Sequence, residues 1–344
     1  MEKDLIALKK SELALGGPVR LPEGYLLPCR LSRSTAGPGA GSAGAVFSFE
    51  GTRVKKAVRY DSGDFELHDR DGTLSLTKGG EPFLDRVTIE PVVYHSPEQA
   101  FFNLDQRCIY HCAFCASPRL GKDATKNLTD EKIVTMVRKA LDDGMTVNAI
   151  SLTSGVVGSP RETVDRFVSC IKALNKEFPG IPIGIEPYAS SEEDIIRLKE
   201  AGATEIKLNI ESPSREIFAK VCPELEYDGI LDRLSDSVKV FGKGNVQSNM
   251  IYGMGETDED VLSMVETLCS MGVIPILRAL RIGEHSRESL ESAIGTTSPV
   301  TPQRSVFLVS EQKKIMERHG LSSAGCRTMC NRCGCCDLVP FKDV

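Results

Sequence analysis

The segment FNLDQRCIYHCAFCASPRL, residues 102–120, places three cysteines within eight residues, immediately after a short apolar stretch. The three are Cys108, Cys112 and Cys115. Thiolates at such spacing are typical ligands of an iron–sulfur cluster or of zinc. Closed sites of either kind normally use four protein ligands. Three cysteines therefore predict a metal centre with one open coordination position, where a substrate or cofactor can bind.

A strand-then-helix pattern surrounds this segment and repeats six times between Gln99 and residue 300. Such alternation implies parallel strands joined by right-handed crossovers, either in an open sheet or in an incomplete barrel. We predict an α/β fold with a partial (β/α)6 barrel over residues 99–300, and three cysteines on the loop after its first strand. Barrels of this kind carry their chemistry at that C-terminal mouth.

The regions on either side of the barrel have different sequence patterns. Residues 1–98 hold short β-like runs separated by Gly and Asp turns, which predict a small antiparallel, β-rich N-terminal module. Residues 301–344 read as one helix followed by a cysteine-rich extension. The sequence therefore predicts three parts, with the barrel in the middle.

Along the predicted barrel strands, polar residues fall at every second position, and the residues between them are apolar. A packed barrel core would not tolerate this, because each unsatisfied buried polar group costs about 1–3 kcal/mol. The pattern favours a wet or ligand-filled lumen, although residues at strand ends would give it too. The polar positions are Asn103, Ser151, Thr153, Glu186, Lys207, Asn209, Glu211, Gln247, Asn249 and Arg278.

The composition limits the cellular location and the kinds of partner that we expect for this chain. The 344 residues are 41% hydrophobic and carry a net charge of −6, which argues against a DNA-binding surface. The first residues, MEKDLIALKKSELALGG, contain no apolar run long enough for a signal peptide or a membrane span. We expect a cytoplasmic protein without a membrane partner.

Twelve cysteines in a cytoplasmic chain favour metal binding over disulfides, because that compartment keeps thiols reduced. A second group lies in CRTMCNRCGCC and predicts a further metal site. An auxiliary iron–sulfur cluster, a structural zinc knuckle, and a thiol carrier or redox relay all fit this group. Its members are Cys326, Cys330, Cys333, Cys335 and Cys336.

The Cx3Cx2C spacing, with Phe114 before the last cysteine and a six-fold β/α pattern around it, resembles the radical S-adenosylmethionine (SAM) superfamily. The resemblance covers about residues 99–290. It implies a [4Fe–4S] cluster on Cys108, Cys112 and Cys115, whose open iron binds SAM. In that family an electron from a donor such as ferredoxin or flavodoxin cleaves SAM to a 5′-deoxyadenosyl radical, which abstracts hydrogen. It also implies anaerobic chemistry.

The resemblance assigns further cofactor-binding candidates. Thr153, Ser154 and Gly155 occupy the place of the family's Gly-Gly-Glu segment, from which their residue types depart. LNIES and NMIYGMGETDED resemble strand motifs of biotin synthase and lipoyl synthase. The glycines of the second motif would let the backbone approach the adenosyl group. The candidates, with Phe114 beside the cysteines, are Thr153, Ser154, Gly155, Glu186, Asn209, Glu211, Gly253, Gly255 and Glu256.

The biotin synthase and lipoyl synthase resemblance implies insertion of sulfur into an octanoyl chain, with the auxiliary cluster as sulfur donor. The chain lacks the N-terminal Cx4Cx5C and Arg-Ser-Ser motifs of ordinary lipoyl synthases. It is similar instead to the archaeal two-protein lipoyl synthases, which implies a partner radical SAM subunit and a lipoyl carrier domain.

The stretch LPCRLSRSTAGPGAGSAG, whose residues 29–43 form a Gly-rich loop, offers a labile ligand for that auxiliary cluster. The candidates are Ser34 and Cys29, with Arg33 beside them. A flexible surface loop is the alternative interpretation. Basic residues at Arg53–Arg59, or at Lys313, Lys314 and Arg318, could dock an acidic carrier, although such runs are usually solvated faces.

Two other function classes stay open on the sequence. One is radical SAM methylation, or a carbon-skeleton rearrangement, of a small molecule or peptide, with the auxiliary cluster relaying electrons. The other is a non-catalytic iron–sulfur scaffold. His111, inside the first cysteine segment, could donate a hydrogen bond near the cluster, but loop histidines are mostly solvated.

Overall fold

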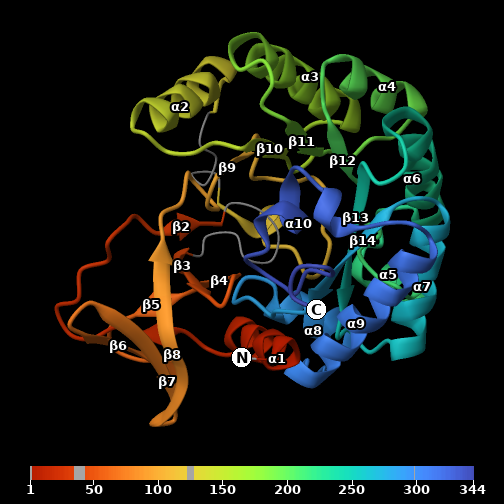
Figure 1. Ribbon diagram of the computed structural model, residues 1–344. Coiled ribbons are helices and arrows are strands. Elements are labelled where there is room, and N and C mark those ends of the chain that lie inside the picture. Colours follow the sequence, from red (N-terminus) through yellow and green to blue (C-terminus); the bar gives the residue numbers. More distant parts are fainter. Residues whose placement is uncertain (1, 35–42, 122–127, 298) are drawn as a thin grey trace.

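The computed structural model describes residues 2–34, 43–121, 128–297 and 299–344 (Figure 1). Within these residues, six parallel strands form one curved sheet in the order β14-β13-β12-β11-β10-β9. This sheet confirms the predicted α/β partial barrel. Its strands are β9 (Gln99–Asn103), β10 (Ala149–Thr153), β11 (Ile183–Glu186), β12 (Glu205–Lys207), β13 (Val246–Tyr252) and β14 (Ile274–Ala279).

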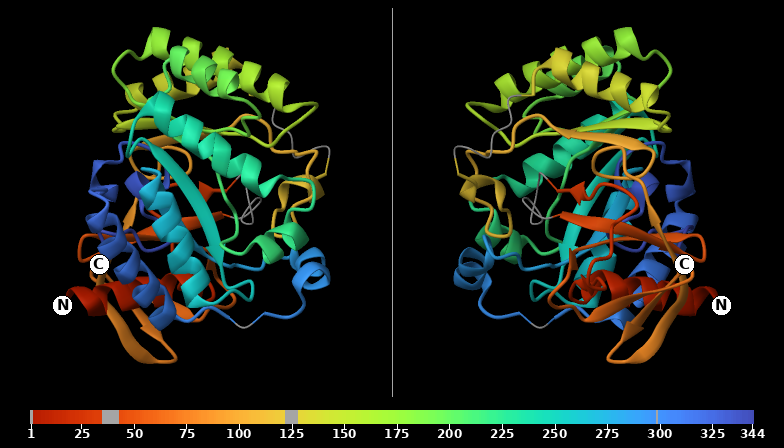
Figure 2. Two further views of the ribbon diagram at one scale, coloured as in Figure 1. Left: turned by 90° about the vertical axis from the view of Figure 1, so that its right-hand side faces the viewer. Right: turned by 90° about the vertical axis from the view of Figure 1, so that its left-hand side faces the viewer.

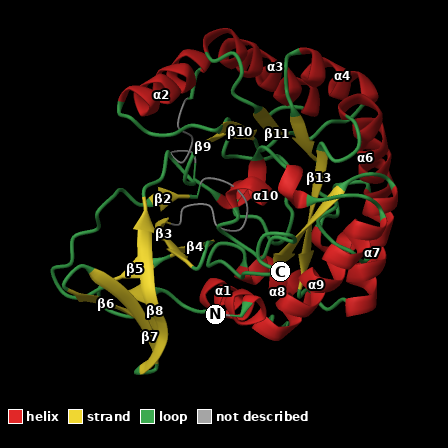
Figure 3. Ribbon diagram, in the orientation of Figure 1, coloured by secondary structure: helices red, strands yellow, loops and turns green. Residues whose placement is uncertain are grey.

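Helices surround the outer face of this curved sheet (Figure 3). Their apolar sides bury residues such as Phe167 and Leu234 in one core with strand residues Ile150 and Ile206. Thr129 accepts a hydrogen bond from the backbone N of Lys132 and so begins the first of these helices, as the sequence predicts. The helices are α2 (Asp130–Asp142), α3 (Pro160–Glu177), α4 (Glu192–Glu200), α5 (Arg215–Val221), α6 (Tyr227–Phe241) and α7 (Asp258–Ser270).

The N-terminal region consists of helix α1 (Lys3–Leu15) and a second sheet with its own apolar core around Phe47, Phe65 and Leu76. The predicted all-antiparallel pairing is wrong in one place, because β1 pairs in parallel with both β5 and β6. A parallel pair needs a long connection, which the residues between β1 and β5 supply. The strands are β1 (Val19–Arg20), β2 (Ser32–Arg33), β3 (Ala43–Phe49), β4 (Thr52–Lys56), β5 (Val58–Arg59), β6 (Phe65–Arg70), β7 (Thr73–Lys78) and β8 (Glu81–Glu90).

The C-terminal part joins these two regions. Helix α8 (Arg287–Ile294) precedes α9 (Pro302–Arg318), which packs against α1, α7 and β14. The short helix α10 (Met329–Cys333) lies inside the curve of the barrel sheet (Figure 1). Both chain ends lie on one side of the molecule (Figure 2). None of the described helices has the length and apolar character needed to cross a membrane.

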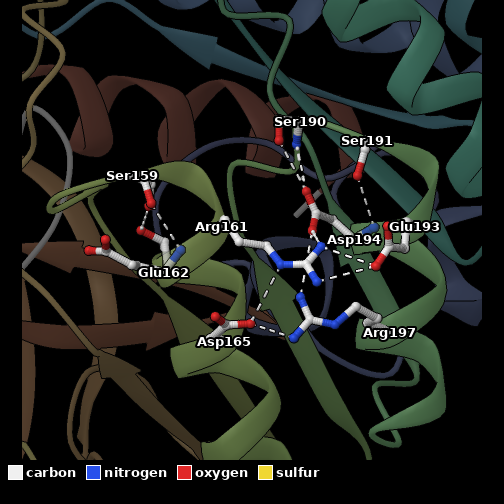
Figure 4. Close-up of polar contacts among 10 residues, drawn as sticks. Ser159, Arg161, Glu162, Asp165, Ser190, Ser191, Glu193, Asp194 and Arg197 are labelled. Atoms are coloured by element: carbon white, nitrogen blue, oxygen red, sulfur yellow. Dashed lines mark hydrogen bonds and ion pairs between the residues drawn. The ribbon is translucent and has the colours of Figure 1, made fainter.

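Charged side chains tie the start of α3 to the start of α4 on the outside of the barrel (Figure 4). Asp194 is the buried centre of this cluster, with its side chain 2% exposed. Its carboxylate accepts a hydrogen bond from the Ser190 hydroxyl at 3.1 Å and pairs with Arg161 at 3.3 Å. Arg197 bridges Asp194 to Asp165 on α3. The cluster fixes two neighbouring barrel helices against each other.

We expect Asp194→Ala to lower the free energy of unfolding by about 1.5–3 kcal/mol, because buried hydrogen bonds to a charged group are lost. Glu193→Ala is the matched control, since Glu193 pairs with the same Arg161 at 3.2 Å but its side chain is 69% exposed. The control should change stability by less than about 1 kcal/mol. Urea denaturation followed by circular dichroism measures both, and equal losses would contradict the assignment.

Candidate active site

A cavity of about 890 Å³ lies inside the curve of the barrel sheet, and both cysteine groups line it. Cys108, Cys112 and Cys115 come from the loop after β9, and Cys330 and Cys333 from α10. The sequence predicts the second group near the barrel mouth that carries the first, and both groups line this one cavity. Side chains from the inward parity of the strands separate them, namely Thr153, Glu186, Lys207, Asn209, Asn249 and Arg278.

Backbone amides point at two sulfurs of the first cysteine group. The N of Val156 lies 3.4 Å from the Cys108 sulfur, and the N of Ser117 lies 3.4 Å from the Cys115 sulfur. Such hydrogen bonds stabilise thiolates and are a feature by which proteins tune iron–sulfur clusters. Phe114, between the last two cysteines, is buried in the barrel core and anchors the loop.

Arg119 and Gly155 hold the loop in this shape. The Arg119 guanidinium donates to the backbone oxygens of Cys112 and Cys115. A Cβ on Gly155 would lie 2.1 Å from the carbonyl oxygen of Arg107, so only glycine lets the β10 loop pack this closely. Gly155 therefore supports the cysteine loop through close backbone packing.

Cys222 lies beside Cys112 at the end of α5, a contact that no sequence pattern indicates. Hydrogen bonding to Cys112 and burial raise the pKa of the Cys222 thiol. His111 lies outside the cavity lining, and its ring contacts Glu224 at 3.2 Å. The predicted role of His111 near a cluster has no support in this position.

Seven predicted cofactor-binding residues line the cavity, and a buried polar group forms around Glu186. Lys207 Nζ lies 2.9 Å from the Glu186 carboxylate, and Asn209 Nδ2 donates to it at 2.8 Å. Burial and the nearby Glu186 charge raise the pKa of Glu211 to about 7. The seven residues are Phe114, Thr153, Ser154, Gly155, Glu186, Asn209 and Glu211.

Gly253, Gly255 and Glu256 are not among the residues that line the cavity, and their contact with an adenosyl group stays a prediction. The Glu256 carboxylate instead accepts from the backbone N of Gly253 at 2.6 Å and from that of Met254 at 2.9 Å. Arg304 of α9 pairs with the same carboxylate at 3.1 Å. The motif therefore turns the chain into α7 and docks α9, because its buried carboxylate needs these partners.

The C-terminal segment enters the barrel at the N-terminal ends of the strands, opposite the first cysteine group. The sequence predicts that this segment binds a cluster and closes over the barrel mouth, and the contacts of residues 327–329 correct its place of entry. The Glu205 carboxylate accepts from the backbone N of Arg327 at 2.8 Å and of Thr328 at 2.9 Å. The backbone N of Met329 donates to Ser151 at 3.2 Å. The polar inward residues of the strands thus satisfy the backbone of residues 327–329, so the C-terminal segment fills this end of the lumen.

Gly184 allows this insertion, because a Cβ there would lie 2.1 Å from the Thr328 hydroxyl. We expect Gly184→Ala to lower the free energy of unfolding by about 1–3 kcal/mol through overpacking. It should also raise amide hydrogen exchange across residues 326–336. Gly325→Ala is the control within the same segment, because nothing lies within 4 Å of its added Cβ. Unchanged exchange in Gly184→Ala would contradict the insertion.

Four of the five C-terminal cysteines line the cavity, and Cys326 does not. The sequence left open which of the five are ligands, and this arrangement favours the four at the cavity. Cys326 is buried behind Asn331, whose Nδ2 lies 3.7 Å from its sulfur. Burial raises the pKa of the Cys326 thiol to about 12, as expected for an inert thiol. The four cavity cysteines are Cys330, Cys333, Cys335 and Cys336.

Two cations of the barrel strands face Cys330. Arg278 Nη2 lies 2.7 Å from its sulfur and Lys207 Nζ 3.4 Å from it. Burial acts to lower the pKa of each cation, but the surrounding sulfurs and carboxylates outweigh it and raise both pKa values. In the sequence, both residues stood out only as inward-facing polar positions.

The basic run Arg53–Arg59 is partly buried, with Arg59 exposed, and its docking role stays a prediction. Lys55 lines the cavity and donates to the Ser34 hydroxyl at 2.6 Å. Lys56 is 7% exposed and donates to the backbone oxygens of α1. Arg53 pairs with Glu90 at 2.9 Å. Thr52, Val54 and Lys56 on one parity of β4 are buried, and Lys55 on the opposite parity lines the cavity.

Of the predicted labile ligands, only Ser34 lines the cavity. Cys29 donates to the backbone oxygen of Glu90 at 3.4 Å and borders a separate small pocket. Arg33 contributes its backbone oxygen to His95, 3.0 Å from Nδ1. Residues 35–42 of the Gly-rich loop lie outside the described residues.

Lys10 of α1 clamps the C-terminal segment to the N-terminal region. Its Nζ lies 2.7 Å from the Asp343 carboxylate and 2.8 Å from the backbone oxygen of Gly334, and both charged side chains are 0% exposed. Thr52 of β4 donates to the same carboxylate at 2.6 Å. The backbone N of Lys55 also donates to the oxygen of Cys335 at 2.7 Å. The N-terminal region therefore holds the second cysteine group in place.

In the part of the chain that the structure describes, no three His, Cys, Asp or Glu side chains converge on the position of a single metal ion. Each cysteine of a [4Fe–4S] cluster binds a different iron atom, so its ligands surround a volume and do not meet at one point. The two cysteine groups border such a volume at opposite sides of the cavity.

Comparisons with known proteins agree on one superfamily. The family model of the radical SAM superfamily matches residues 103–268 of this chain. The biotin synthase of Brachyspira hyodysenteriae is 32% identical over 175 residues, which cover 49% of this chain and 50% of that protein. The lipoyl synthase of Buchnera aphidicola subsp. Schizaphis graminum is 25% identical over 203 residues, covering 58% of this chain and 60% of that protein. The chain thus spans about half the length of the curated relatives it matches.

Solved structures show the same fold at low identity. Methylornithine synthase (PylB) aligns with a TM-score of 0.51 and 17% identity, covering 66% of this chain and 70% of that one. The hydrogenase maturase HydG from Carboxydothermus hydrogenoformans aligns with a TM-score of 0.53 and 17% identity, covering 64% and 52%. At this identity the likeness describes the arrangement of strands and helices alone.

Proposed function

Because this chain carries a radical SAM domain, we propose that it is an enzyme that cleaves SAM reductively and abstracts hydrogen from a substrate held in its barrel cavity. The observation that carries the proposal is the first cysteine group, which lies at the cavity with backbone N–H groups 3.4 Å from the sulfurs of Cys108 and Cys115. These residues fit a cluster, because thiolates with such donors are its usual ligands.

When bound, the [4Fe–4S] cluster and SAM supply a one-electron cleavage that yields a 5′-deoxyadenosyl radical. The chain's own residues hold and enclose the reactants. Thr153, Glu186 and Asn209 present polar groups beside the cysteine loop. Glu211, whose pKa is raised to about 7, can offer a proton to a hydroxyl or carboxylate at neutral pH.

Exclusion of water falls to the C-terminal segment, which fills the other end of the lumen and satisfies the buried carboxylate of Glu205. A reactive carbon radical needs such an enclosed site, because side reactions would quench it. The rings of Tyr110 and Tyr188, with centroids 5.1 Å apart, flank the cavity beside the cysteine loop.

We further propose sulfur insertion into an alkyl chain, such as a protein-bound octanoyl group, with a second cluster on the C-terminal cysteines. Relatives named biotin synthase and lipoyl synthase support this reaction class. Apolar side chains of Ile230, Ile251 and Ile276 line the same cavity and suit an alkyl substrate. A lipoyl carrier domain and a second radical SAM subunit remain the proposed partners, with ferredoxin or flavodoxin as electron donor.

Electron relay by the second cluster, in a methylation or rearrangement, is the second candidate. It is favoured by the four cavity cysteines, since four thiolates complete the ligand set of a closed [4Fe–4S] cluster. A closed cluster suits electron transfer, whereas sulfur donation consumes the cluster. Loss of cluster sulfide during turnover therefore separates the two candidates.

The proposal is tested with the full chain, reconstituted anaerobically with iron and sulfide, reduced with dithionite and given SAM. We expect 5′-deoxyadenosine and methionine in equal amounts. An octanoylated carrier peptide should increase their formation and gain sulfur. Absence of 5′-deoxyadenosine from protein that carries the first cluster would overturn the proposed activity.

A further inference from the structure

Cys330 differs from Cys333 and Cys335 in the charges that surround its sulfur. Arg278 lies 2.7 Å away and Lys207 3.4 Å away, so two cationic donors from β14 and β12 meet at one thiolate. Arg278 also interacts with Cys336, but Lys207 faces Cys330. Cys333 and Cys335 instead pack with the apolar side chains of Val46 and Val92. Of the four cavity cysteines, Cys333 and Cys335 therefore lie under apolar cover, whereas Cys330 and Cys336 face Arg278.

Neither cation can turn away easily, because each is held by a carboxylate. Lys207 is 2% exposed and pairs with Glu186 at 2.9 Å. Arg278 pairs with Asp337 at 2.8 Å, and Asp337 also pairs with Arg281 at 3.0 Å. The positions of both donors are thus fixed before anything binds.

The backbone on both sides of Cys330 is fixed as well. Met329 has a φ of +61°, a strained conformation for a side chain of its size. It is bound through its backbone to Ser151 at 3.2 Å and to Gln99 at 3.4 Å. Asn331 donates to Gln247 at 3.2 Å. Three barrel strands therefore place the Cys330 sulfur at one point of the lumen.

We infer that Cys330 is the exchangeable ligand of the cluster on the C-terminal cysteines, and that Lys207 and Arg278 are positioning residues that weaken its bond to iron. The inference rests on the proposed function, in which these cysteines hold a cluster. Two charge-assisted hydrogen bonds draw electron density from a thiolate, so it donates less to its iron. The hydrogen-bond partners of Cys333 in the described residues, Ser96 and Cys335, carry no positive charge, so we expect Cys333 to stay bound.

The exchange requires no redox change. An incoming ligand forms a bond to the iron as the Cys330 thiolate leaves, and the thiolate keeps its charge, balanced by Arg278 and Lys207. The freed iron then faces the lumen. This assigns to Cys330 the position where a substrate can reach the second cluster.

The test uses the full chain with Cys108, Cys112 and Cys115 replaced by Ala, so that only the C-terminal cysteines can hold iron. After reconstitution we expect about four irons per chain. Adding Cys330→Ala should leave about four, and ¹³C-cyanide should then give a hyperfine coupling in the EPR spectrum of the reduced cluster. Adding Cys333→Ala should abolish iron binding, which makes it the matched control.

Arg278→Met and Lys207→Gln test the positioning role in the same background. Asp337 keeps Arg281 as its partner in Arg278→Met, and the amide introduced by Lys207→Gln retains a donor for Glu186. Each variant should move the reduction potential of the cluster to a more negative value, because a positive charge is removed, and should slow cyanide binding. A merely structural role would change iron content but not the potential of the cluster that remains.

Iron loss in Cys330→Ala equal to that in Cys333→Ala would overturn the inference, and so would potentials and cyanide rates that stay unchanged in both cation variants. If the variant with three alanines binds no iron, the C-terminal cysteines hold no cluster, and the inference is overturned. Formation of 5′-deoxyadenosine by the unaltered chain is measured separately, so failure of the main proposal remains distinguishable.

Discussion

Cys115→Ala should reduce the formation of 5′-deoxyadenosine by at least about 10³-fold, to the level of protein without a cluster. The Cys115 sulfur lies at the cavity and receives the backbone N of Ser117 at 3.4 Å. With two thiolates left, the first cluster loses a ligand that no neighbouring described cysteine except Cys222 could replace. A drop of this size corresponds to about 4 kcal/mol in the barrier.

The measurement pairs product formation by chromatography with iron content and the EPR signal of the reduced cluster. Cys29→Ala is the control, because Cys29 borders a separate small pocket and donates only to Glu90. The control should keep its iron and its rate. Full activity in Cys115→Ala would reject the first cysteine group as the reaction centre. Cys115→Ala could retain some cluster. If that cluster disappears in the double variant Cys115→Ala/Cys222→Ala, Cys222 is a substitute ligand.

Lys10→Met should lower the free energy of unfolding by about 3–5 kcal/mol, because it leaves the buried Asp343 carboxylate without its cation. Gly334 also loses the donor to its backbone oxygen. Since these contacts hold the segment that carries Cys333 and Cys335, the variant should release iron from the second group while the first group keeps its own. Thermal denaturation and iron counts measure the two effects.

Lys78→Met is the matched control for this prediction. Lys78 pairs with Glu12 of the same helix at 2.6 Å, but its side chain is 44% exposed. Exposed ion pairs contribute only about 0–1 kcal/mol, so the control should remain close to the unaltered protein in stability and iron content. Equal losses in the two lysine variants would show that helix α1 is sensitive to any change, and would reject the clamp.

Local patterns in the sequence were sufficient for the barrel. Helix and strand periodicity, with a cap such as Thr129, predicted the six strand–helix units, because side-chain alternation and capping depend on near neighbours in the chain. The spacing of Cys108, Cys112 and Cys115 predicted a metal centre for the same reason, since one short loop carries all its ligands. The inward polar parity of Lys207 and Arg278 was also visible.

Contacts between distant parts of the chain lay beyond such patterns. Nothing near Lys55 in the sequence indicates that it points into a cavity, and nothing near Glu256 indicates that its carboxylate pairs with Arg304 of α9. Cys326 lies close in sequence to the other C-terminal cysteines but turns away from their cavity. Each of these positions depends on which distant part of the folded chain packs against the residue.

The sequence by itself determined the partial barrel and the three-cysteine loop, because both arise from regular spacing over short stretches. Only the tertiary structure decided that the C-terminal segment enters the barrel and sets Cys330 beside Lys207 and Arg278. That arrangement results from buried polar groups, such as Glu205 and Ser151, finding partners more than a hundred residues away. Burial makes an unpaired polar group costly, and the partner that removes the cost is chosen by the fold as a whole.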